Sequence, residues 1–506
     1  MNVDLHTHVS LKTMLGAVKN AERNSCWYTL KSNFLDALSG GILGSQSSLN
    51  QMKSGNIQMA VTPLYSLEHA FSKSWLLKDV VTKIEKKLSK KYLTKIRDNQ
   101  ISPYANLCEE LQHVRDAENS NMVLIESIDS FDPGKMNLIL ALEGLHSFQD
   151  KYIDSVQAHL AAITKNFTDF IIQNRVLYVG LSHLTRNPIC THSYAMKMIN
   201  DQAFIPEGSG LTDTARAMID LCYSGTAKFG KKVLIDIKHM GLNSRLQFYE
   251  YRKHKNYTSI PIVASHVAVT GCSFNNIKIN SAHASDKYED CIEVSYQHTS
   301  SDVVYKYETS PQLEYVDFNP WSLNLFDEEI ENIILSEGII GLILDMRVLG
   351  SKGDDFGDMD PEGSEYFSKA SYESLKAENR FNTNPDTTPI TDPTDTVDID
   401  SIVGLKSTMH LFANLLHIIR TYHKQHNNLK AWDHVCIGSD SDGLIQPIKE
   451  YQNATNFDDL REAMFEVFEA ERKRDHLKVY FGTFDSRMLV NKLFYSNATK
   501  FINANL

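Results

Sequence analysis

Eight short apolar runs recur along the chain, and helix-like sequence follows each of them. Some runs, such as residues 138–142, are continuously apolar, which is typical of strands covered on both faces, because half-exposed strands alternate. The runs span residues 2–5, 57–64, 136–142, 176–181, 233–237, 260–264, 338–344 and 434–438. Taken alone, each is equally compatible with a buried turn of helix. Their number and order predict an α/β fold, a parallel (β/α)8 TIM barrel.

Helix candidates lie between and after these runs. They span residues 327–336, 407–423, 457–473 and 485–495, and Ser or Asp stands in capping position at several of them. The alternation of strand and helix is what a barrel requires. At 506 residues and 42% hydrophobic composition, a single hydrolase barrel over residues 1–506 with long insertions fits the length.

Two insertions interrupt the alternation, one after the sixth and one after the seventh predicted strand. Residues 272–320 contain β-like pieces, so we expect a small accessory hairpin or sheet there. Residues 351–400 carry 13 Asp and Glu against 4 Lys and Arg, which accounts for −9 of the net charge of −12. This acidic segment projects from the face where barrel active sites form, as a lid or as a disordered segment.

Composition narrows the class of protein. Lys and Arg occur only in short runs, so we expect no nucleic-acid partner. Seven scattered cysteines without a CxxC pair indicate neither a disulfide framework nor a thiolate zinc site, and favour a reducing compartment. No run of about 18 apolar residues occurs, so we expect no membrane span. The first candidate metal ligand is residue 6, which leaves no room for a signal peptide, and we therefore expect a cytoplasmic protein.

Chemistry-bearing side chains stand at the ends of the predicted strands. His6 and His8 end the first strand, where residues two apart point the same way and both imidazoles could hold one metal ion. Glu143 ends the third strand, where a carboxylate is costly unless a cation or metal pairs with it. His239 and His266 follow the fifth and sixth strands. Each residue alone is more often a surface, packed or salt-bridged side chain.

The succession of these residues is more specific than any one of them. Asp440 follows the eighth strand, among glycines that permit a tight turn. Barrel enzymes draw their catalytic groups from the carboxyl ends of different strands, so five such ends in succession are hard to obtain by chance. We therefore predict a metal site with His6, His8, Glu143, His239 and His266 as ligands.

The motifs resemble, in order, those of the membrane (renal) dipeptidase family of zinc peptidases in the amidohydrolase superfamily. The similar segments are residues 142–147, 178–183, 234–239, 262–266, 438–443 and 495–498. The resemblance implies two zinc ions per chain. It gives Glu143 as the bridging ligand, His239 and His266 as ligands of one ion, and His6 and His8 as ligands of the other.

The resemblance also implies the reaction, hydrolysis of a dipeptide or related small amide by a metal-activated hydroxide. Asp440 would accept and pass on the proton, and His183, after the fourth strand, would contact the substrate carbonyl and steady the oxyanion. Alternatively, His183 simply packs. Strand alternation points Asp236 away from His239, so we place it outside the site, where it can orient a neighbouring ligand.

Two departures from the family bear on the substrate. The first motif is His-x-His where the family has His-x-Asp, and residues 267–278 lack the arginine that clamps the substrate carboxylate. Lys278 and Arg347 are the candidate replacements, although Lys lacks the bidentate fork.

Two other functions stay open. One is another amidohydrolase reaction, on a cyclic amide or lactone, because fold and metals do not fix the substrate. The other is a non-catalytic metal-binding barrel whose insertions contact partners. A small-molecule or dipeptide substrate is the expected partner, and the resemblance leaves a homodimer open. The sequence contains neither a Gly-x-Ser-x-Gly elbow nor a Gly-rich phosphate loop after the first strand. These two observations argue against a serine hydrolase and against a nucleotide-binding protein.

Overall fold

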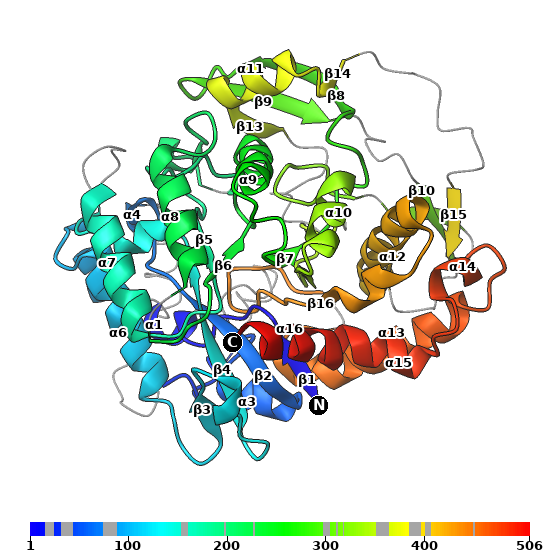
Figure 1. Cartoon of the computed structure of the whole chain (residues 1–506), viewed down its shortest axis with the longest axis horizontal. Helices are drawn as coiled ribbons and strands as arrows, with labels where there is room; N and C mark the ends of the chain where they lie inside the picture. Colours follow the sequence, from blue (N-terminus) through cyan, green and yellow to red (C-terminus); the bar gives the residue numbers. More distant parts are fainter. Residues whose placement is uncertain are drawn as a thin grey trace.

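A parallel barrel forms the centre of the molecule in the computed structural model (Figure 1). The structure describes residues 1–15, 25–31, 44–73, 89–152, 160–196, 199–225, 228–296, 304–309, 312–316, 318–350, 364–383, 396–399, 406–448 and 451–506. The barrel strands, in chain order and in spatial order, are β1 (Asn2–Asp4), β2 (Ile57–Leu64), β4 (Met136–Glu143), β5 (Tyr178–Gly180), β6 (Leu234–Asp236), β7 (Ile262–Val267), β12 (Ile339–Leu342) and β16 (Val435–Ile437). These are the eight strands that the apolar runs predict, and the TIM-barrel prediction is confirmed.

The barrel is closed between its first and last strands. The Leu5 amide donates to the Ile437 carbonyl at 2.9 Å, and the Asp440 amide donates to the His6 carbonyl at the same distance. An additional short strand, β3 (Met122–Leu124), pairs with β4 outside this circle. All eight residues of β4 are buried, as expected for a continuously apolar strand between a barrel interior and a helical layer.

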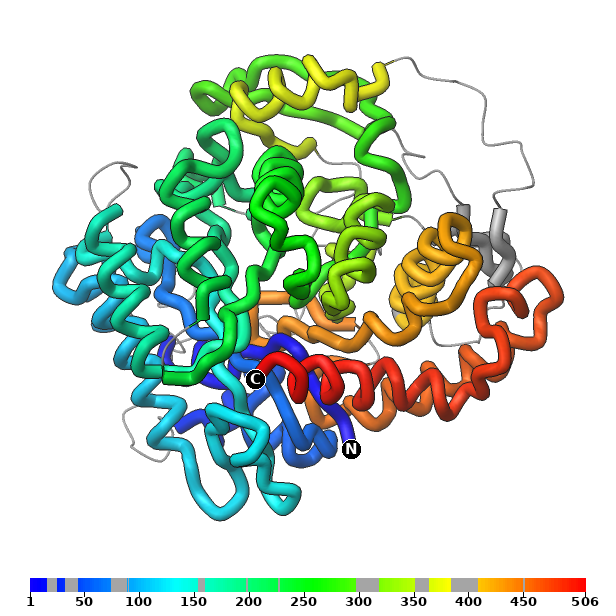
Figure 2. The backbone as a smooth tube through the Cα atoms, in the orientation of Figure 1, coloured from blue at the N-terminus to red at the C-terminus, as the bar shows by residue number. Residues whose placement is uncertain are grey.

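Helices surround the strands (Figure 1). They are α1 (Leu11–Leu15), α3 (Leu49–Ser54), α4 (His69–Lys73), α5 (Lys90–Arg97), α6 (Pro103–Arg115), α7 (Leu160–Gln173), α8 (Asp213–Ser224), α9 (Leu242–His254), α10 (Asp327–Leu335), α11 (Lys369–Ala377), α12 (Lys406–His426), α13 (Phe457–Glu471), α14 (Lys478–Phe481), α15 (Ser486–Asn491) and α16 (Asn497–Asn505). The predicted helices match α10, α12, α13 and α15. A π-helical turn at Lys492–Ser496 joins α15 to α16, which passes beside β1 (Figure 2).

The two insertions pair with each other. The one after β7 supplies β8 (Ile277–Ala284), β9 (Cys291–Tyr296), β10 (Val304–Thr309) and β11 (Gln312–Val316), and the one after β12 supplies β13 (Glu365–Ser368), β14 (Phe381–Asn382) and β15 (Thr396–Ile399). Strands β13, β9, β8 and β14 form one sheet, and β11, β10 and β15 form another. The acidic segment is therefore ordered over residues 364–383. The question of lid or disorder for residues 351–363 and 384–395 lies outside the described residues.

Two glycines set the spacing of the strands beneath the candidate site. A Cβ at Gly341 would lie 2.0 Å from the Ser265 carbonyl oxygen, and one at Gly438 would lie 1.9 Å from it. Only glycine permits this approach. The close packing of β12 and β16 on β7 places the loop that follows β16 next to His266.

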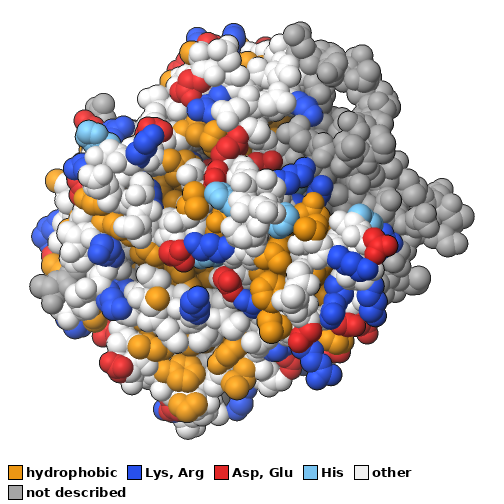
Figure 3. Space-filling model, turned by 45° about the vertical axis from the view of Figure 1, so that its right-hand side comes forward, with side chains coloured by type: hydrophobic (Ala, Val, Ile, Leu, Met, Phe, Trp, Pro, Cys, Tyr) orange, Lys and Arg blue, Asp and Glu red, His pale blue; other side chains and the backbone are white. Residues whose placement is uncertain are grey.

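The charges on the surface and the apolarity of the helices bear on nucleic-acid binding and on a membrane span. Basic and acidic side chains are interspersed over the face shown in Figure 3. Among the helices that the structure describes, none has both the length and the apolarity to cross a membrane.

Candidate metal centre

The five predicted ligands converge at the carboxyl ends of their strands, because a barrel brings all these ends to one face. Each is almost completely buried, with exposed fractions between 0% for His6 and 7% for His239. His6 and His8 follow β1, Glu143 is the last residue of β4, and His266 lies near the end of β7. Residues from strands more than 200 positions apart in the sequence thus share one small volume.

Glu143 is the hub of this cluster. Its Oε1 atom lies 3.2 Å from His239 Nε2, 3.6 Å from His6 Nε2 and 3.6 Å from His266 Nε2. Its Oε2 atom lies 3.3 Å from His8 Nε2. A single carboxylate therefore faces four imidazoles with both of its oxygens, which is the arrangement that a bridging ligand between two ions requires.

Asp440 closes the cluster from the side of β16. Its Oδ1 atom lies 3.4 Å from His8 Nε2 and 3.7 Å from His6 Nε2. His239 and Asp440 both adopt left-handed backbone conformations, with φ of 66° and 58°. Such conformations are unfavourable for residues other than glycine and concentrate at functional sites. Both side chains reach the cluster, although neither residue belongs to the regular part of its strand.

Four groups of side chains could each hold a metal ion, with ligand atoms within 4.8 Å of one another. They are His6, Glu143 and His266; His6, His8 and Asp440; Glu143, His183 and His239; and Glu68, His146 and His183. The first three share members and form one centre. They group His266 with His6, whereas the resemblance assigned it with His239, and they add His183 and Asp440 to the possible ligands.

The donor atoms fit a metal ion. His6 Nε2 is buried and has no hydrogen-bond partner in the described part of the chain, because its carboxylate neighbours lie beyond hydrogen-bond distance. A buried imidazole nitrogen without a partner is costly unless a cation completes it. Imidazole and carboxylate together suit zinc and similar divalent ions.

The electrostatics favour neutral imidazoles at most of these positions. Burial lowers the pKa of His239 to about 3 and holds the pKa of His266 well below its usual range. Burial alone would also lower the pKa of His8, but hydrogen bonds to Asp440 and Glu143 raise it to about 10. Burial would raise the pKa of Glu143, yet the surrounding histidines, led by His183, hold it well below its usual value.

A second layer of hydrogen bonds orients the ligands. Ser265 Oγ lies 2.7 Å from His266 Nδ1 and donates to Asp236 Oδ2 at 2.5 Å. Tyr178 Oη lies 3.0 Å from His6 Nδ1. Metal-bound histidines have such outer partners, which fix the tautomer and the ring orientation. Asp236 thus acts on a neighbouring ligand through Ser265, the arrangement that strand alternation predicts.

His183 also reaches the centre. It follows β5, and its Nε2 atom lies 3.7 Å from Glu143 Oε1. Its Nδ1 atom makes a short hydrogen bond with Glu68 Oε1. Burial would lower the pKa of His183, but the charges of Glu68 and Glu143 raise it. Sequence reasoning missed Glu68, because it lies in the loop after β2 and belongs to none of the recognised motifs.

The two candidates for the substrate carboxylate are placed differently from expectation. Arg347 donates to both oxygens of Asp345, at 3.0 and 2.6 Å, so its guanidinium is already engaged by a carboxylate. Lys278 lies on β8 opposite Asn382 in the accessory sheet. Arg347 is therefore paired with Asp345 and Lys278 lies in the insertion, and a carboxylate clamp formed by either residue stays a prediction.

Lys238 is a buried cation that the sequence pattern did not single out. It is 2% exposed, and its Nζ atom has no hydrogen-bond partner among the described residues. Burial lowers the pKa of Lys238 to about 8 against the opposing influence of Asp440 and Asp236. Strand alternation, which puts Lys238 on the same face as Asp236, is the signal that could have revealed it.

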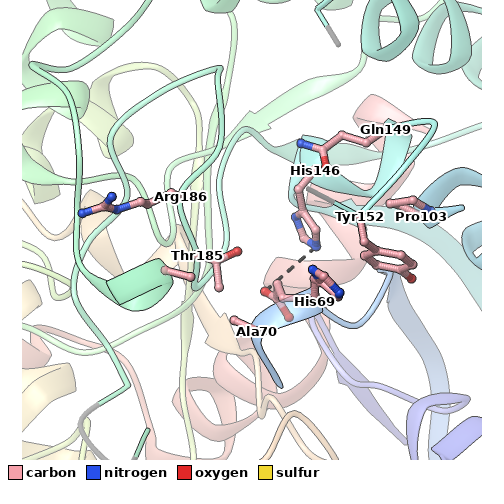
Figure 4. Close-up of a pocket in the computed structure, with 10 residues that line it drawn as sticks. His69, Ala70, Pro103, His146, Gln149, Tyr152, Thr185 and Arg186 are labelled. Atoms are coloured by element: carbon pink, nitrogen blue, oxygen red, sulfur yellow. Dashed lines mark ion pairs between the residues drawn. The ribbon is translucent and has the colours of Figure 1, made fainter. Parts of the chain in front are cut away.

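A small polar pocket lies beside the cluster (Figure 4). Its volume of about 30 Å³ exceeds the roughly 10–15 Å³ that one water molecule requires. Thr185 and Arg186 line one side, and His146, Gln149 and Tyr152 line the other. Glu68 also lines it, so the partner of His183 separates this pocket from the centre.

Comparisons with known proteins establish the fold. By sequence, neither a protein-family model nor a curated protein matches the chain. A solved structure described as a dipeptidase and metallopeptidase is similar over 100% of this chain and 98% of its own, with a TM-score of 0.50 and 13% identity. A metallopeptidase from Rhodobacter sphaeroides, bound to a phosphinate mimic of the dipeptide L-Ala-D-Ala, is similar over 100% and 99%, with a TM-score of 0.52 and 14% identity. At these identities the likeness concerns the fold, which agrees with the fold implied by the resemblance to the dipeptidase family.

Proposed function

We propose that this chain is a metal-dependent hydrolase related to the membrane dipeptidases, which cleaves the amide bond of a dipeptide or a similar small amide. The observation that carries the proposal is the position of Glu143, which faces His6, His8, His239 and His266 at the carboxyl end of the barrel. This is the face on which barrel enzymes carry their active sites. The fold that the chain shares with two metallopeptidase structures supports it.

Zinc, two ions per chain, is the proposed cofactor. His6 and His8 would hold one ion, His239 and His266 the other, and Glu143 both. When bound, such ions supply a hydroxide nucleophile near neutral pH and polarise a carbonyl group. The hydrogen bond between His266 Nδ1 and Ser265 Oγ fixes the orientation of this ligand ring.

Asp440 and His183 are the proposed catalytic residues. Asp440 Oδ1 lies beside the two histidines of β1, so it can accept a proton from the attacking water and deliver it to the leaving amine. His183 Nε2 lies 3.7 Å from Glu143 Oε1, where an imidazole N–H can donate to the oxygen of the tetrahedral intermediate. Both are nearly buried, and a water-poor site strengthens these interactions.

A panel of amides tests the proposal. The purified chain would be assayed with zinc on L,L- and L,D-dipeptides, N-acetylated dipeptides, dihydropyrimidines and lactones, alongside Glu143→Ala. Hydrolysis of dipeptides that is lost in the variant supports the dipeptidase assignment. Turnover confined to cyclic amides or lactones would replace the substrate class, and bound metal without turnover on any member would point to a non-catalytic barrel.

One observation favours the second substrate class. Dipeptidases of this family clamp the substrate carboxylate with an arginine that the loop after β7 lacks, and Arg347 is occupied by Asp345. A cyclic amide or lactone needs no carboxylate clamp. If this substrate class is correct, N-acetylation of a substrate or removal of its carboxylate will not raise KM.

A further inference from the structure

The two ring nitrogens of His183 face two different carboxylates. Nε2 faces Glu143 Oε1 at 3.7 Å, and Nδ1 hydrogen-bonds Glu68 Oε1. His183 is 7% exposed and Glu68 is 2% exposed. A buried imidazole that is held at one nitrogen has a defined ring orientation, because rotation would break the hydrogen bond without replacement by water.

Hydrogen bonds fix the backbone on both sides of Glu68. It lies in the loop after β2, where the Ser66 amide donates to Ser147 Oγ at 2.9 Å. The Ser66 carbonyl oxygen lies 2.9 Å from His146 Nε2, and the Phe71 amide donates to the Glu68 carbonyl at 3.1 Å. The loop is thus tied to the segment that follows Glu143, and Glu68 is positioned by the same strands that position the metal ligands.

We propose that Glu68 is a positioning residue that holds His183 with Nε2 turned toward Glu143 and the substrate. This inference rests on the proposed function, in which His183 contacts the reacting carbonyl. Among the described residues, Glu68 forms ion pairs with His183 and, at 4.0 Å, with His146, and with no other imidazole of the cluster. Its effect on the reaction therefore passes through His183.

Hydrogen bonds occupy two of the imidazole nitrogens that a further metal site at these residues would use. Glu68, His146 and His183 are close enough to share an ion, but His146 Nε2 must carry a hydrogen to bond the Ser66 carbonyl oxygen. A protonated nitrogen has no lone pair for a metal. His183 Nδ1 is likewise committed to Glu68. Glu68 also lines the small pocket in Figure 4.

The test compares Glu68→Ala and Glu68→Gln with wild type, on the best substrate of the panel at fixed metal. The alanine variant is expected to lose about 10–100-fold in kcat with KM within about twofold, as is usual when an outer hydrogen-bond partner is removed. The glutamine variant keeps a carbonyl acceptor of the same length, so it should recover most of kcat. Glu365→Gln, which changes a buried carboxylate of the accessory sheet, is the matched control and should keep wild-type kcat.

A double-mutant cycle tests whether Glu68 acts through His183. In the His183→Ala background, Glu68→Ala should cost less than about twofold in kcat, because the group that it positions is gone. Additive losses, an unchanged kcat in Glu68→Ala, or a rise in KM alone would each overturn the proposal. The last result would indicate that Glu68 binds the substrate directly.

A structural readout separates failure of this inference from failure of the proposed function. The ¹⁵N resonances of the His183 ring, assigned by their loss in His183→Ala, report which nitrogen carries the hydrogen. We expect a protonated Nδ1 in wild type and in Glu68→Gln, even if no amide is hydrolysed. If Nδ1 of wild type lacks the hydrogen, or if the Gln variant leaves Nδ1 exchanging like an exposed ring, Glu68 does not position His183, whatever the substrate is. The Gln variant serves this test if Glu68→Ala fails to fold.

Discussion

Glu143→Gln is the most informative single substitution, because it removes a charge and preserves the shape of the side chain. The carboxylate lies between 3.2 and 3.6 Å from the Nε2 atoms of the four proposed histidine ligands, His6, His8, His239 and His266. Any ion held by these nitrogens would lie next to it. A unit charge and a divalent ion about 4 Å apart interact by about 8 kcal/mol at an effective dielectric constant of about 20.

Desolvation of the carboxylate offsets part of this energy. If it offsets half, about 4 kcal/mol remains, which corresponds to roughly thousandfold weaker metal binding. Glu143→Gln should therefore lose bound metal on dialysis that wild type survives. Metal per chain would be measured by elemental analysis, and affinity by competition with a chromophoric chelator.

The control is Glu365→Gln, which makes the same replacement of a carboxylate by an amide at a buried position of the accessory sheet. It should bind metal as wild type does. Equal metal affinity in wild type and Glu143→Gln would show that Glu143 is not a ligand. Absence of metal from wild type itself, after exposure to zinc, would refute the whole centre.

Four further outcomes are expected. Ser265→Ala removes the partner of His266 Nδ1 and should weaken metal binding about 10–100-fold; unchanged affinity would count against His266 as a ligand. Asp440→Asn should lower kcat about 10²–10⁴-fold with metal largely retained, and a fully active variant would remove Asp440 from the mechanism. Chelation should lower the free energy of unfolding by about 4 kcal/mol for each bound ion, relative to protein at zinc concentrations about 1,000 times Kd, and thermal unfolding with and without chelator would measure this loss. Burial raises the pKa of Glu365 from its usual 4.5 to about 7, so the folded state holds this proton more tightly. The resulting stabilisation is present below about pH 4.5 and is lost as the pH rises through about 7, by about 3 kcal/mol. Glu365→Gln should abolish this dependence in urea unfolding at pH 4.5 and 8, and a pH-independent difference between variant and wild type would contradict it.

The local pattern of apolar residues was sufficient to predict the barrel strands and most of the candidate site residues at their ends. Each strand is a short apolar run whose character depends on its own residues, because burial on both faces demands it. The ends of parallel strands meet at one face, so His6, Glu143, His239 and His266 could be grouped before any contact was known. Sequence order alone therefore located the cluster around Glu143.

Contacts between distant segments depended on the tertiary structure. The two insertions pair as β9 with β13 and β10 with β15, and pairing of separate segments leaves no local signature. The hydrogen bond from His183 to Glu68 and the engagement of Arg347 by Asp345 arise in loops after strands. Loop conformation depends on what surrounds it, and side-chain partners there are selected by geometry that no periodicity encodes. The sequence by itself thus determined the strand order and which candidate ligands stand at the strand ends, whereas only the folded chain showed that Glu68 contacts His183 and that Asp345 pairs with Arg347.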